Sequence, residues 1–423
     1  MITGPPPKFN GTRDILRVER VPEGETMRQH QRSLAALTFP PQGLGEQEEI
    51  LRRAGQADAC LAEGKTYAFL RHRHVSQIAR LPSGRIPTME FLQSTEPAEP
   101  TLAEMWANLS GSLEGTSHRR VRVLTRRALS RPTALDSRWL IDLATATLER
   151  NVLSVDGADL LHDFVYPFVT QALSRLVFGD VGQDVRIRRW SDALNRCLFR
   201  PSAQNLGVAE QIARDLRECI EQEVPDVDCI MTRARARDST GDRMTPPEQS
   251  ALIGNVAFGG IDTTAKAIGN GLFTVLRLNL GPLVREASAV VDRRAMVEEL
   301  LRLEPPVAGV TRTVDKCEQV EGVELPPGSV VMGVGLLANR DPDVFARPHE
   351  FLADRGECPH TTFGGSSPHH CVGKEIARDL YLVALSAVVD AAPNVALATL
   401  PERVPWHAGG TFRGILALPV RCA

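Results

Sequence analysis

Residues 361–378 read Thr-Thr-Phe-Gly-Gly-Ser-Ser-Pro-His-His-Cys-Val-Gly-Lys-Glu-Ile-Ala-Arg, and Cys371 stands where a loop of small residues meets an apolar repeat. The apolar side chains of that repeat follow helical spacing, at Ile376, Leu380, Ala384 and Ala387. A thiol at the start of a helix lies near the positive end of the helix dipole and near unpaired backbone N–H groups, which favour the thiolate. The segment therefore predicts an anionic sulfur that binds a metal.

Cys371 also has an ordinary alternative role. A single cysteine is most often a small buried apolar residue, and this chain contains 8 of them. None belongs to a CxxC pair or to a zinc-like cluster in the sequence. Thiols scattered in this way are typical of the reducing cytosol, so we expect a cytoplasmic protein.

The length and composition limit the classes of protein to consider. A chain of 423 residues can bury a large core, as two or three domains or as one large enzyme. Its hydrophobic fraction of 43%, charged fraction of 24% and net charge of −3 give no sign of binding to nucleic acid or to a membrane surface. The first residues contain no apolar run of signal or anchor length, which favours a cytoplasmic protein that has no membrane anchor.

Residues 117–129 predict an amphipathic helix that carries two cationic side chains on one face. His118 and Arg122 are four residues apart, so their side chains lie one helical turn apart. Two cationic donors at this spacing suit a pair of carboxylates. We interpret the other arginines of the segment as a solvated basic face, namely Arg119, Arg120, Arg126 and Arg127.

A long helix is predicted from Thr245 to about Gly281. Thr245 and Glu248 form the pattern of a capping box, and no firm helix stop follows for roughly 35 residues, which span on the order of 50 Å. Its middle, residues 257–264, reads Ala-Phe-Gly-Gly-Ile-Asp-Thr-Thr. Two glycines weaken a helix by about 1 kcal/mol each, but they remove side chains where another group must approach the backbone. The structural alternative for Thr263 is a hydrogen bond back to a carbonyl one turn earlier.

Residues 292–306 predict a helix that ends at a Pro-Pro pair. The helix contains Glu299 and Arg302, an i,i+3 pair that stabilises by only tenths of a kcal/mol when it is exposed. Residues 307–334 then read as strands joined by tight turns, and Arg312 lies at the start of this region.

Three further regions give weaker predictions. Residues 66–75 favour a strand followed by a turn, with His72 and His74 as surface residues on one face of the strand. Residues 81–110 are rich in Pro, Ser, Thr and Glu and lack periodicity, so we expect a long loop. Residues 411–420 favour a terminal hairpin.

Four short patterns follow one another along the chain: HxxxR at His118, GGxDTT at Gly259, ExxR at Glu299 and the cysteine loop at Cys371. In this order they resemble the cytochrome P-450 family, and the resemblance spans roughly residues 60–423. It implies a mainly α fold with small β-sheets, a triangular prism in which haem lies between the long central helix and the helix that follows the cysteine.

The resemblance also implies one domain over residues 1–423. Its β-rich parts are expected mostly within residues 1–80 and 307–335. Its helical parts are expected within residues 105–305 and 371–390.

The cofactor implied by the resemblance is haem b, with the Cys371 thiolate as the axial ligand of the iron. The other cofactor-binding residues that it implies are His118, Arg122, Gly259, Gly260, Arg312, Phe363, His369 and Gly373. The loop departs from the family pattern FxxGxxxCxG, because Phe363 lies eight residues before Cys371 in place of seven, and Ser367 stands where a glycine is usual. The additional residue bears on the hydrogen bonds to the sulfur, and so on the reduction potential, and not on which residue is the ligand.

The resemblance assigns further roles. Thr263 would take part in oxygen activation, and Asp262 would relay protons from solvent. The structural residues that it implies are Glu299, Arg302 and Arg355. Besides part of residues 84–107, an apolar substrate pocket is expected to be lined by Phe258, Ile261, Val307, Val310 and Phe412.

The implied function is that of a haem-thiolate monooxygenase, which activates O2 to oxidise a small organic substrate. We expect it to tailor a bacterial secondary metabolite, by hydroxylation or by oxidative coupling. Its electron donors would be ferredoxin and ferredoxin reductase, with an acidic ferredoxin docking near the basic helix of residues 117–129. We expect a monomer that binds neither nucleic acid nor a membrane.

Two alternatives to this function are kept. One is a haem-thiolate protein that binds without turnover, as a sensor or an assembly partner. The other is a peroxide-driven peroxygenase, whose chemistry does not need the proton relay at Thr263.

Overall fold

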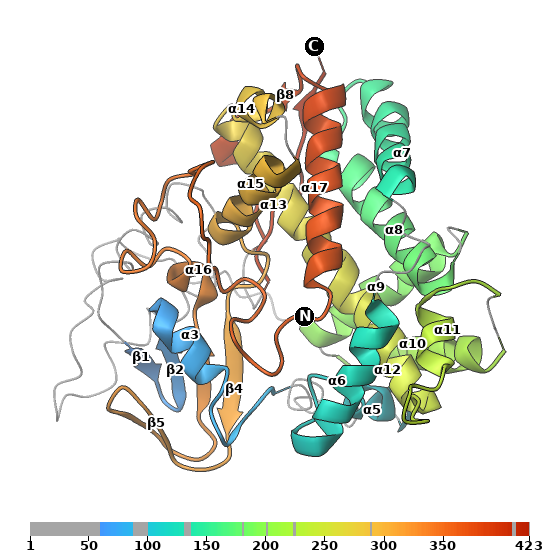
Figure 1. Ribbon diagram of the computed structural model, residues 1–423, viewed down its shortest axis with the longest axis vertical. Coiled ribbons are helices and arrows are strands. Elements are labelled where there is room, and N and C mark those ends of the chain that lie inside the picture. Colours follow the sequence, from blue (N-terminus) through green and yellow to red (C-terminus); the bar gives the residue numbers. More distant parts are fainter. Residues whose placement is uncertain are drawn as a thin grey trace, which may run out of the picture.

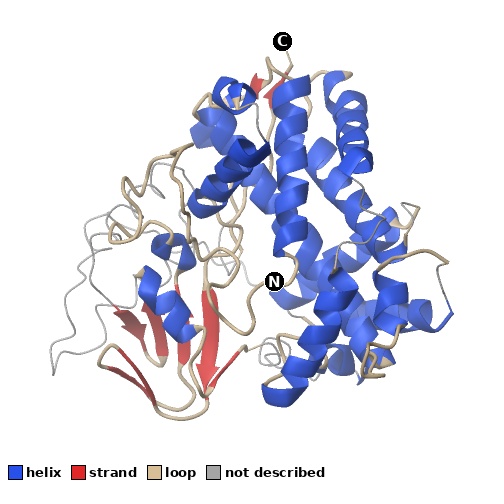
Figure 2. Ribbon diagram, in the orientation of Figure 1, coloured by secondary structure: helices blue, strands red, loops and turns tan. Residues whose placement is uncertain are grey.

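The computed structural model describes residues 60–87, 100–130, 137–179, 182–199, 202–222, 226–287, 290–407 and 412–422. Within this part of the chain, helices form the bulk of the molecule and most of the short strands gather at one corner, at the lower left of Figures 1 and 2. The prediction of a mainly α fold with small β-sheets is therefore confirmed. Of the helices described, none is both long enough and apolar enough to cross a membrane. Residues 1–59 of the predicted β-rich part lie outside the described residues.

The strands form one larger sheet, a hairpin of β5 and β6, and a two-stranded sheet of β8 and β9, so the hairpin predicted over residues 411–420 is wrong in that β9 pairs with residues 396–397. Their bounds are β1 (Cys60–Glu63), β2 (Thr66–Phe69), β3 (Gly84–Arg85), β4 (Val310–Val314), β5 (Glu318–Val320), β6 (Val323–Leu325), β7 (Val330–Gly333), β8 (Ala396–Leu397) and β9 (Val420–Arg421). In the described chain the larger sheet has five strands in the order β1-β2-β7-β4-β3. β2 and β7 are parallel, with Thr66 opposite Val330, and the other neighbours are antiparallel. The sheet therefore joins the start of the described chain to a region far along the sequence.

The helices cover the rest of the described chain. Their bounds are α3 (His72–Ile78), α5 (Pro100–Ala107), α6 (Gly115–Leu129), α7 (Ser137–Leu148), α8 (Tyr166–Phe178), α9 (Asp184–Phe199), α10 (Ala203–Gln222), α11 (Ile230–Arg235), α12 (Pro246–Asn255), α13 (Asp262–Arg277), α14 (Gly281–Glu286), α15 (Val290–Leu303), α16 (Gly335–Ala338) and α17 (Lys374–Ala391). Shorter π-helical and 3-10 segments are η2 (Glu149–Leu153), η3 (Leu160–Val165), η4 (Val256–Ile261) and η5 (Pro401–Arg403). The helices predicted before the Pro-Pro pair and after the cysteine are confirmed as α15 and α17.

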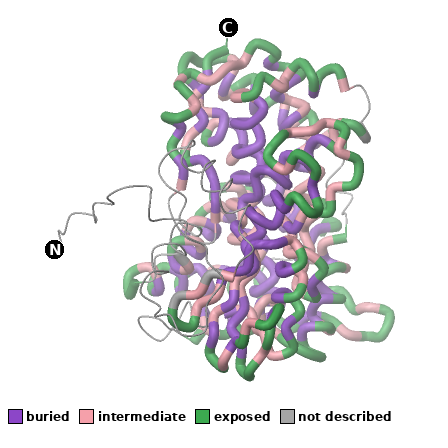
Figure 3. The backbone as a smooth tube through the Cα atoms, turned by 90° about the vertical axis from the view of Figure 1, so that its left-hand side faces the viewer, coloured by how far each residue is buried: buried purple, intermediate pink, exposed green. Residues whose placement is uncertain are grey.

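One continuous helical segment crosses the core, from α12 through η4 to the end of α13. Its predicted start is confirmed, because the Thr245 hydroxyl accepts the Glu248 N–H at 3.4 Å and the Glu248 carboxylate accepts the Thr245 N–H at 2.8 Å. The backbone stays helical at both internal junctions. The π turn of η4 was not predicted; π turns widen a helix locally and often lie at functional sites. Figure 3 shows buried residues concentrated in the middle of the molecule, where this segment runs.

The prediction for residues 66–75 is wrong after the strand β2, because α3 begins at His72. The N-terminus of α3 has two partners that sequence periodicity does not reveal. The Asp341 carboxylate accepts the His72 N–H at 2.9 Å, and Nδ1 of His74 accepts the Arg71 N–H at 3.3 Å. His74 is buried, with Nε2 3.0 Å from a Glu321 oxygen, so it is not a surface residue on a strand.

The loop predicted over residues 81–110 is also shorter than expected. Residues 100–107 form the helix α5, and Leu102, Met105 and Trp106 bury their side chains in the core. Residues 88–99 lie outside the described residues.

Candidate active site

The cysteine loop is closed by one backbone hydrogen bond. The Cys371 N–H donates to the Phe363 carbonyl at 2.9 Å and so joins the two ends of the longer segment, and within it the His370 N–H donates to the Ser367 carbonyl at 3.1 Å. Gly364 and Gly365 have φ angles of 89° and 61°, in the left-handed region that favours glycine. The additional residue of the loop is thus accommodated where two successive glycines reverse the chain.

Cys371 directly precedes the residues that lead into α17, and its sulfur has a mixed electrostatic environment. The side chain is exposed to solvent, yet burial among protein atoms raises the pKa of its thiol. A hydrogen bond from the Gly373 N–H and the charges of Arg122, Lys374 and Arg378 act in the opposite direction and lower this pKa. These local groups act toward the thiolate, but burial has the larger effect, so the net pKa of the thiol is raised and the predicted preference for the thiolate stays a prediction.

Four cationic side chains gather beside this loop, and we refer to them as the α6 cation cluster: His118, Arg122, Arg312 and His369. The rings of His118 and His369 are 4.0 Å apart, and Arg122 donates to the carbonyl of His370, the residue before the cysteine. Arg312 and His369 line a cavity of about 220 Å3, together with residues of the cysteine loop. The structure thus brings together the propionate-binding residues that the resemblance implies.

The α6 cation cluster contains more positive than negative charge. Burial, the His369 ring and Arg122 lower the pKa of His118 to about 4, and burial together with Arg126 lowers the pKa of Arg122 to about 10. Glu114 lies 3.2 Å from Nε2 of His369, but burial still lowers the pKa of that histidine. Among the described residues, Nε2 of His118 and Nε of Arg122 are buried with no hydrogen-bond partner. Buried cationic donors in such excess fit a ligand that carries two carboxylates, so these residues fit the propionates of haem.

The basic face predicted for α6 is only partly solvated. Arg119 and Arg126 are exposed, as expected. Arg120 binds Asp242 at 2.8 Å and Glu248 at 2.6 Å, and Arg127 donates to the carbonyls of residues 233 and 236. The expectation of a fully solvated face is wrong for these two, because α6 packs against the chain that leads into the central helix.

The two glycines of the central helix have different surroundings. The Thr263 hydroxyl donates to the Gly259 carbonyl across the π turn, which is the structural alternative considered for this threonine. A Cβ at Gly260 would lie 3.2 Å from Cδ1 of Leu173, so this glycine faces α8. A Cβ at Gly259 would meet only the Asn255 side-chain oxygen, at 3.4 Å. Close approach of another group to the backbone therefore suits Gly259 better than Gly260.

The residues expected to line the substrate pocket fall into three groups. Val307 and Phe412 form an isolated β-bridge, which brings the end of α15 and the C-terminal segment together. Val310 lies on the wall of the cavity beside Arg312. The Phe258 ring is 5.5 Å from that of Trp106, and Ile261 has no exposed surface and lies in the core. The structure therefore does not place Ile261 on a cavity wall.

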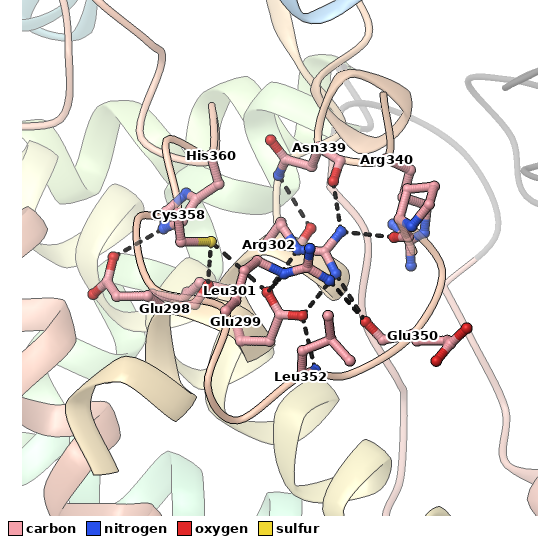
Figure 4. Close-up of polar contacts among 12 residues, drawn as sticks. Glu298, Glu299, Leu301, Arg302, Asn339, Arg340, Glu350, Leu352, Cys358 and His360 are labelled. Atoms are coloured by element: carbon pink, nitrogen blue, oxygen red, sulfur yellow. Dashed lines mark hydrogen bonds and ion pairs between the residues drawn. The ribbon is translucent and has the colours of Figure 1, made fainter. Parts of the chain in front are cut away.

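Glu299, Arg302 and Arg355 form a second charged group, which we call the Glu299 cluster (Figure 4). The Glu299 and Arg302 side chains are 1% and 0% exposed, and two hydrogen bonds of 2.7 and 2.8 Å join them. Arg355 adds a third bond to Glu299, at 2.7 Å. Burial alone would raise the pKa of Glu299, but the bonds from both arginines hold it below its usual value. Arg302 also donates to the backbone carbonyls of residues 339, 348 and 350, so the cluster ties α15 to the segment before the cysteine loop.

Sequence analysis missed two residues beside Asp262. The Tyr166 hydroxyl donates to Oδ1 of Asp262 at 2.6 Å, and the Lys266 ammonium binds Oδ2. The i,i+4 spacing of Asp262 and Lys266 is a signal that could have revealed the second contact. Tyr166 is 96 positions away in the sequence, and no pattern connects it to the central helix.

Known proteins share the fold and part of the sequence. A family model described as cytochrome P450 matches residues 293–391. Cytochrome P450 monooxygenase PikC of Streptomyces venezuelae is 27% identical over 78% of this chain and 80% of its own, and 6-deoxyerythronolide B hydroxylase of Saccharopolyspora erythraea is 26% identical over 75% and 78%. Among solved structures, epothilone B-bound cytochrome P450epoK has a TM-score of 0.77 at 21% identity, covering 88% of this chain and 96% of its own.

The fold, the cysteine loop and the cation cluster beside it are those of a haem-thiolate protein. The chain is similar to cytochrome P450 monooxygenases over about three quarters of its length, and its residues 293–391 match the model of that family.

Proposed function

We propose that Cys371 binds the iron of haem b and that the α6 cation cluster binds the two haem propionates. The observation that carries this proposal is that Arg122 of the cluster lies directly beside the cysteine. Arg122 donates to the carbonyl beside Cys371, and its charge and that of the sulfur act on one another. Haem bound through a thiolate supplies the reduction and cleavage of O2.

The residues of the chain prepare this chemistry in three ways. The Gly373 N–H and the nearby cations stabilise the anionic sulfur. The α6 cation cluster neutralises the propionates and orients the cofactor. On the central helix, Thr263 can turn its hydroxyl from the Gly259 carbonyl toward O2 and pass on a proton that Asp262 provides.

The substrate we propose is an apolar secondary metabolite of the polyketide type, oxidised by hydroxylation or by oxidative coupling. The apolar residues Phe258, Val307, Val310 and Phe412 support an apolar substrate. Similar curated proteins include 6-deoxyerythronolide B hydroxylase and the polyketide biosynthesis cytochrome P450 PksS of Bacillus subtilis, the latter 24% identical over 72% of this chain and 75% of its own. A protein of this class works on a substrate whose identity is set by the pocket and not by the fold.

The electron donor we propose is an acidic ferredoxin with its reductase. Arg119 and Arg126 are the exposed cations of α6, on the same helix as the propionate-binding residues. Exposed positive charge near the cofactor would accelerate the association with a negatively charged partner. We also propose that the protein is a cytoplasmic monomer.

The first experiment tests the iron ligand. The protein loaded with haem, reduced and exposed to carbon monoxide, should give the red-shifted Soret band from which the family takes its name. Cys371→Ser should abolish this band, and Cys317→Ser, at an exposed thiol far from the site, should leave it unchanged. A normal band in Cys371→Ser would refute the assignment.

The second experiment tests turnover. The holoenzyme, a surrogate ferredoxin pair, NADPH and a macrolide aglycone should give a product that contains one oxygen atom from labelled O2. Oxidation by hydrogen peroxide alone, with no gain from NADPH, would favour a peroxygenase. NADPH consumption that no panel substrate stimulates would favour a protein that binds haem without turnover.

A further inference from the structure

Asp262 is held at both carboxylate oxygens by different parts of the molecule. Asp262 is the first residue of α13 and directly follows the π turn that contains Gly259. Oδ1 accepts the Tyr166 hydroxyl at 2.6 Å, and Oδ2 accepts the Lys266 ammonium. The side chains of Asp262 and Lys266 are 17% and 10% exposed, so water competes little for these contacts.

Tyr166 connects Asp262 to the outer face of the molecule. The Tyr166 ring stacks on His162 at 5.7 Å, and the Arg188 guanidinium lies 4.1 Å from its centre. Arg188 pairs with Asp192 at 3.1 Å, and both line a surface hollow of about 390 Å3 between α9 and α10. Burial and the charge of Asp262 raise the pKa of Tyr166 well above its ordinary value. Tyr166 therefore stays protonated at neutral pH and donates its hydroxyl proton in a hydrogen bond to the Asp262 carboxylate.

Lys266 connects Asp262 to the C-terminal segment. Its ammonium lies 5.5 Å from the centre of the Phe412 ring. A Cβ at Gly414 would lie 2.7 Å from Cγ of Lys266, so only glycine admits the lysine stem at this position. One turn later, Asn270 accepts the Ile415 N–H at 3.0 Å and fixes the same segment to α13. The lysine is thus confined between the relay acid and a residue that is expected to contact substrate.

We propose that Tyr166 and Lys266 are positioning residues that hold the Asp262 carboxylate beside Thr263, with Tyr166 on the side from which protons enter. This inference rests on the proposed monooxygenase function. Hydrogen bonds at both oxygens hold the Asp262 carboxylate in one orientation. It can exchange a proton with Thr263 only after one of the two donors has moved away. The two donors differ in kind, since the phenol adds a hydrogen bond without charge and the ammonium also balances the carboxylate charge.

The contact itself can be measured without turnover. The chain has only three tyrosines, so the haem-loaded, carbon monoxide-bound protein labelled with 13C at tyrosine Cζ should give three resolved signals. Tyr166→Phe identifies one of them by its loss. Asp262→Asn should shift that signal and leave the signals of Tyr67 and Tyr381 in place. An unshifted Tyr166 signal in Asp262→Asn would overturn the proposal.

The consequence for catalysis is measured by coupling, the amount of product formed per NADPH consumed. Tyr166→Phe and Lys266→Met should each lower coupling by about tenfold, below the ~100-fold that can follow a displacement of 1 Å at a reacting group. Their solvent deuterium isotope effect on product formation should rise, because proton delivery becomes slower than the competing release of reduced oxygen. Lys266→Arg, which keeps the charge, should recover part of the loss.

The matched control is Tyr67→Phe, on β2 and outside the site, which should keep wild-type coupling. All variants should keep the carbon monoxide spectrum of the wild type, which shows that the cofactor site is intact. Wild-type coupling and an unchanged isotope effect in Tyr166→Phe would refute the positioning role. If the wild type itself forms no product, the monooxygenase proposal fails, and the tyrosine signals still decide whether the contact exists.

Discussion

The Glu299 cluster and the α6 cation cluster differ in whether the protein itself supplies a counter-charge for their buried basic side chains. In the Glu299 cluster, one buried carboxylate is bound by Arg302 and Arg355. Arg302 also donates hydrogen bonds to backbone carbonyls. In the α6 cation cluster, buried basic donors lie together, and burial and neighbouring positive charges lower the pKa of both His118 and Arg122. The first cluster is complete within the protein, whereas the second, under the proposed function, would gain its counter-charge from the haem propionates. The same kind of residue therefore stabilises the fold in one place and prepares a binding site in the other.

The largest effect is expected from breaking the complete cluster. Glu299→Gln removes the carboxylate and leaves two buried guanidinium groups without a counter-charge, so it should lower the free energy of unfolding by about 3–5 kcal/mol. Urea unfolding of the apoprotein measures this change, because no cofactor is needed for the cluster to form. A change below about 1 kcal/mol would show that water reaches the cluster and screens its charges.

The incomplete cluster should make the apoprotein sensitive to acid. The pKa of folded His118 is about 4, below the ordinary value of about 6.5, so the unfolded chain binds this proton more tightly. Stability is therefore fully present above about pH 6.5 and is lost as the pH falls to about 4, by up to about 3 kcal/mol.

Urea unfolding of the apoprotein across that pH range, in the wild type and in His118→Gln, measures this loss. The variant should lose less stability than the wild type. With haem bound, the propionates should stabilise protonated His118, so the holoprotein should also lose less. An equal pH dependence in all three would contradict the interpretation of the α6 cation cluster as a site for carboxylates.

A smaller effect is expected from removing one member of the incomplete cluster. Arg122→Met should accelerate the loss of haem to a scavenger protein by about 10–100-fold, as second-shell changes commonly do at metal sites. The same variant should change the stability of the apoprotein by no more than about 1 kcal/mol, because only one hydrogen bond to a carbonyl is lost. If Arg122→Met destabilised the apoprotein but retained haem normally, Arg122 would be a residue that stabilises the fold and not one that binds the cofactor.

The smallest effect is expected at an exposed ion pair, which serves as the reference for Glu299→Gln. Glu350 and Arg347 form a pair with the same i,i+3 spacing as Glu299 and Arg302, but both side chains are about 60% exposed. Glu350→Gln should lower the free energy of unfolding by less than about 1 kcal/mol. The difference between the two glutamates then measures the combined contribution of burial and of the additional bond from Arg355 at Glu299.

Local signals in the sequence predicted the elements whose cause is local. The capping box at Thr245 marked the true start of the central helix, and the apolar spacing after Cys371 marked α17. The order of the four patterns predicted the family and the residues that gather around the cysteine. The i,i+3 pair of Glu299 and Arg302 could be named, although its complete burial could not be known from spacing alone.

The failures have tertiary causes. The helix α3 depends on Asp341, a residue far along the chain that binds its first N–H, so periodicity alone predicted a strand and a turn. Gly260 and Ile261 follow one another in the central helix, yet the first packs on α8 and the second enters the core. A π turn rotates the residues after it relative to a regular α-helix, and the sequence carries no simple mark of that rotation.

The parallel pairing of β2 with β7 also sets a delay during synthesis. Thr66 lies opposite Val330, and 330 − 66 = 264 residues separate them. At about 5–20 residues per second, a ribosome needs about 13–50 s to make that length. During this time the edge of β2 that later pairs with β7 remains unpaired. An unpaired strand edge is a template for pairing with other chains, so the sheet is the region most exposed to aggregation while the chain is being made. Slowing translation should therefore lower the soluble yield unless a chaperone covers this edge.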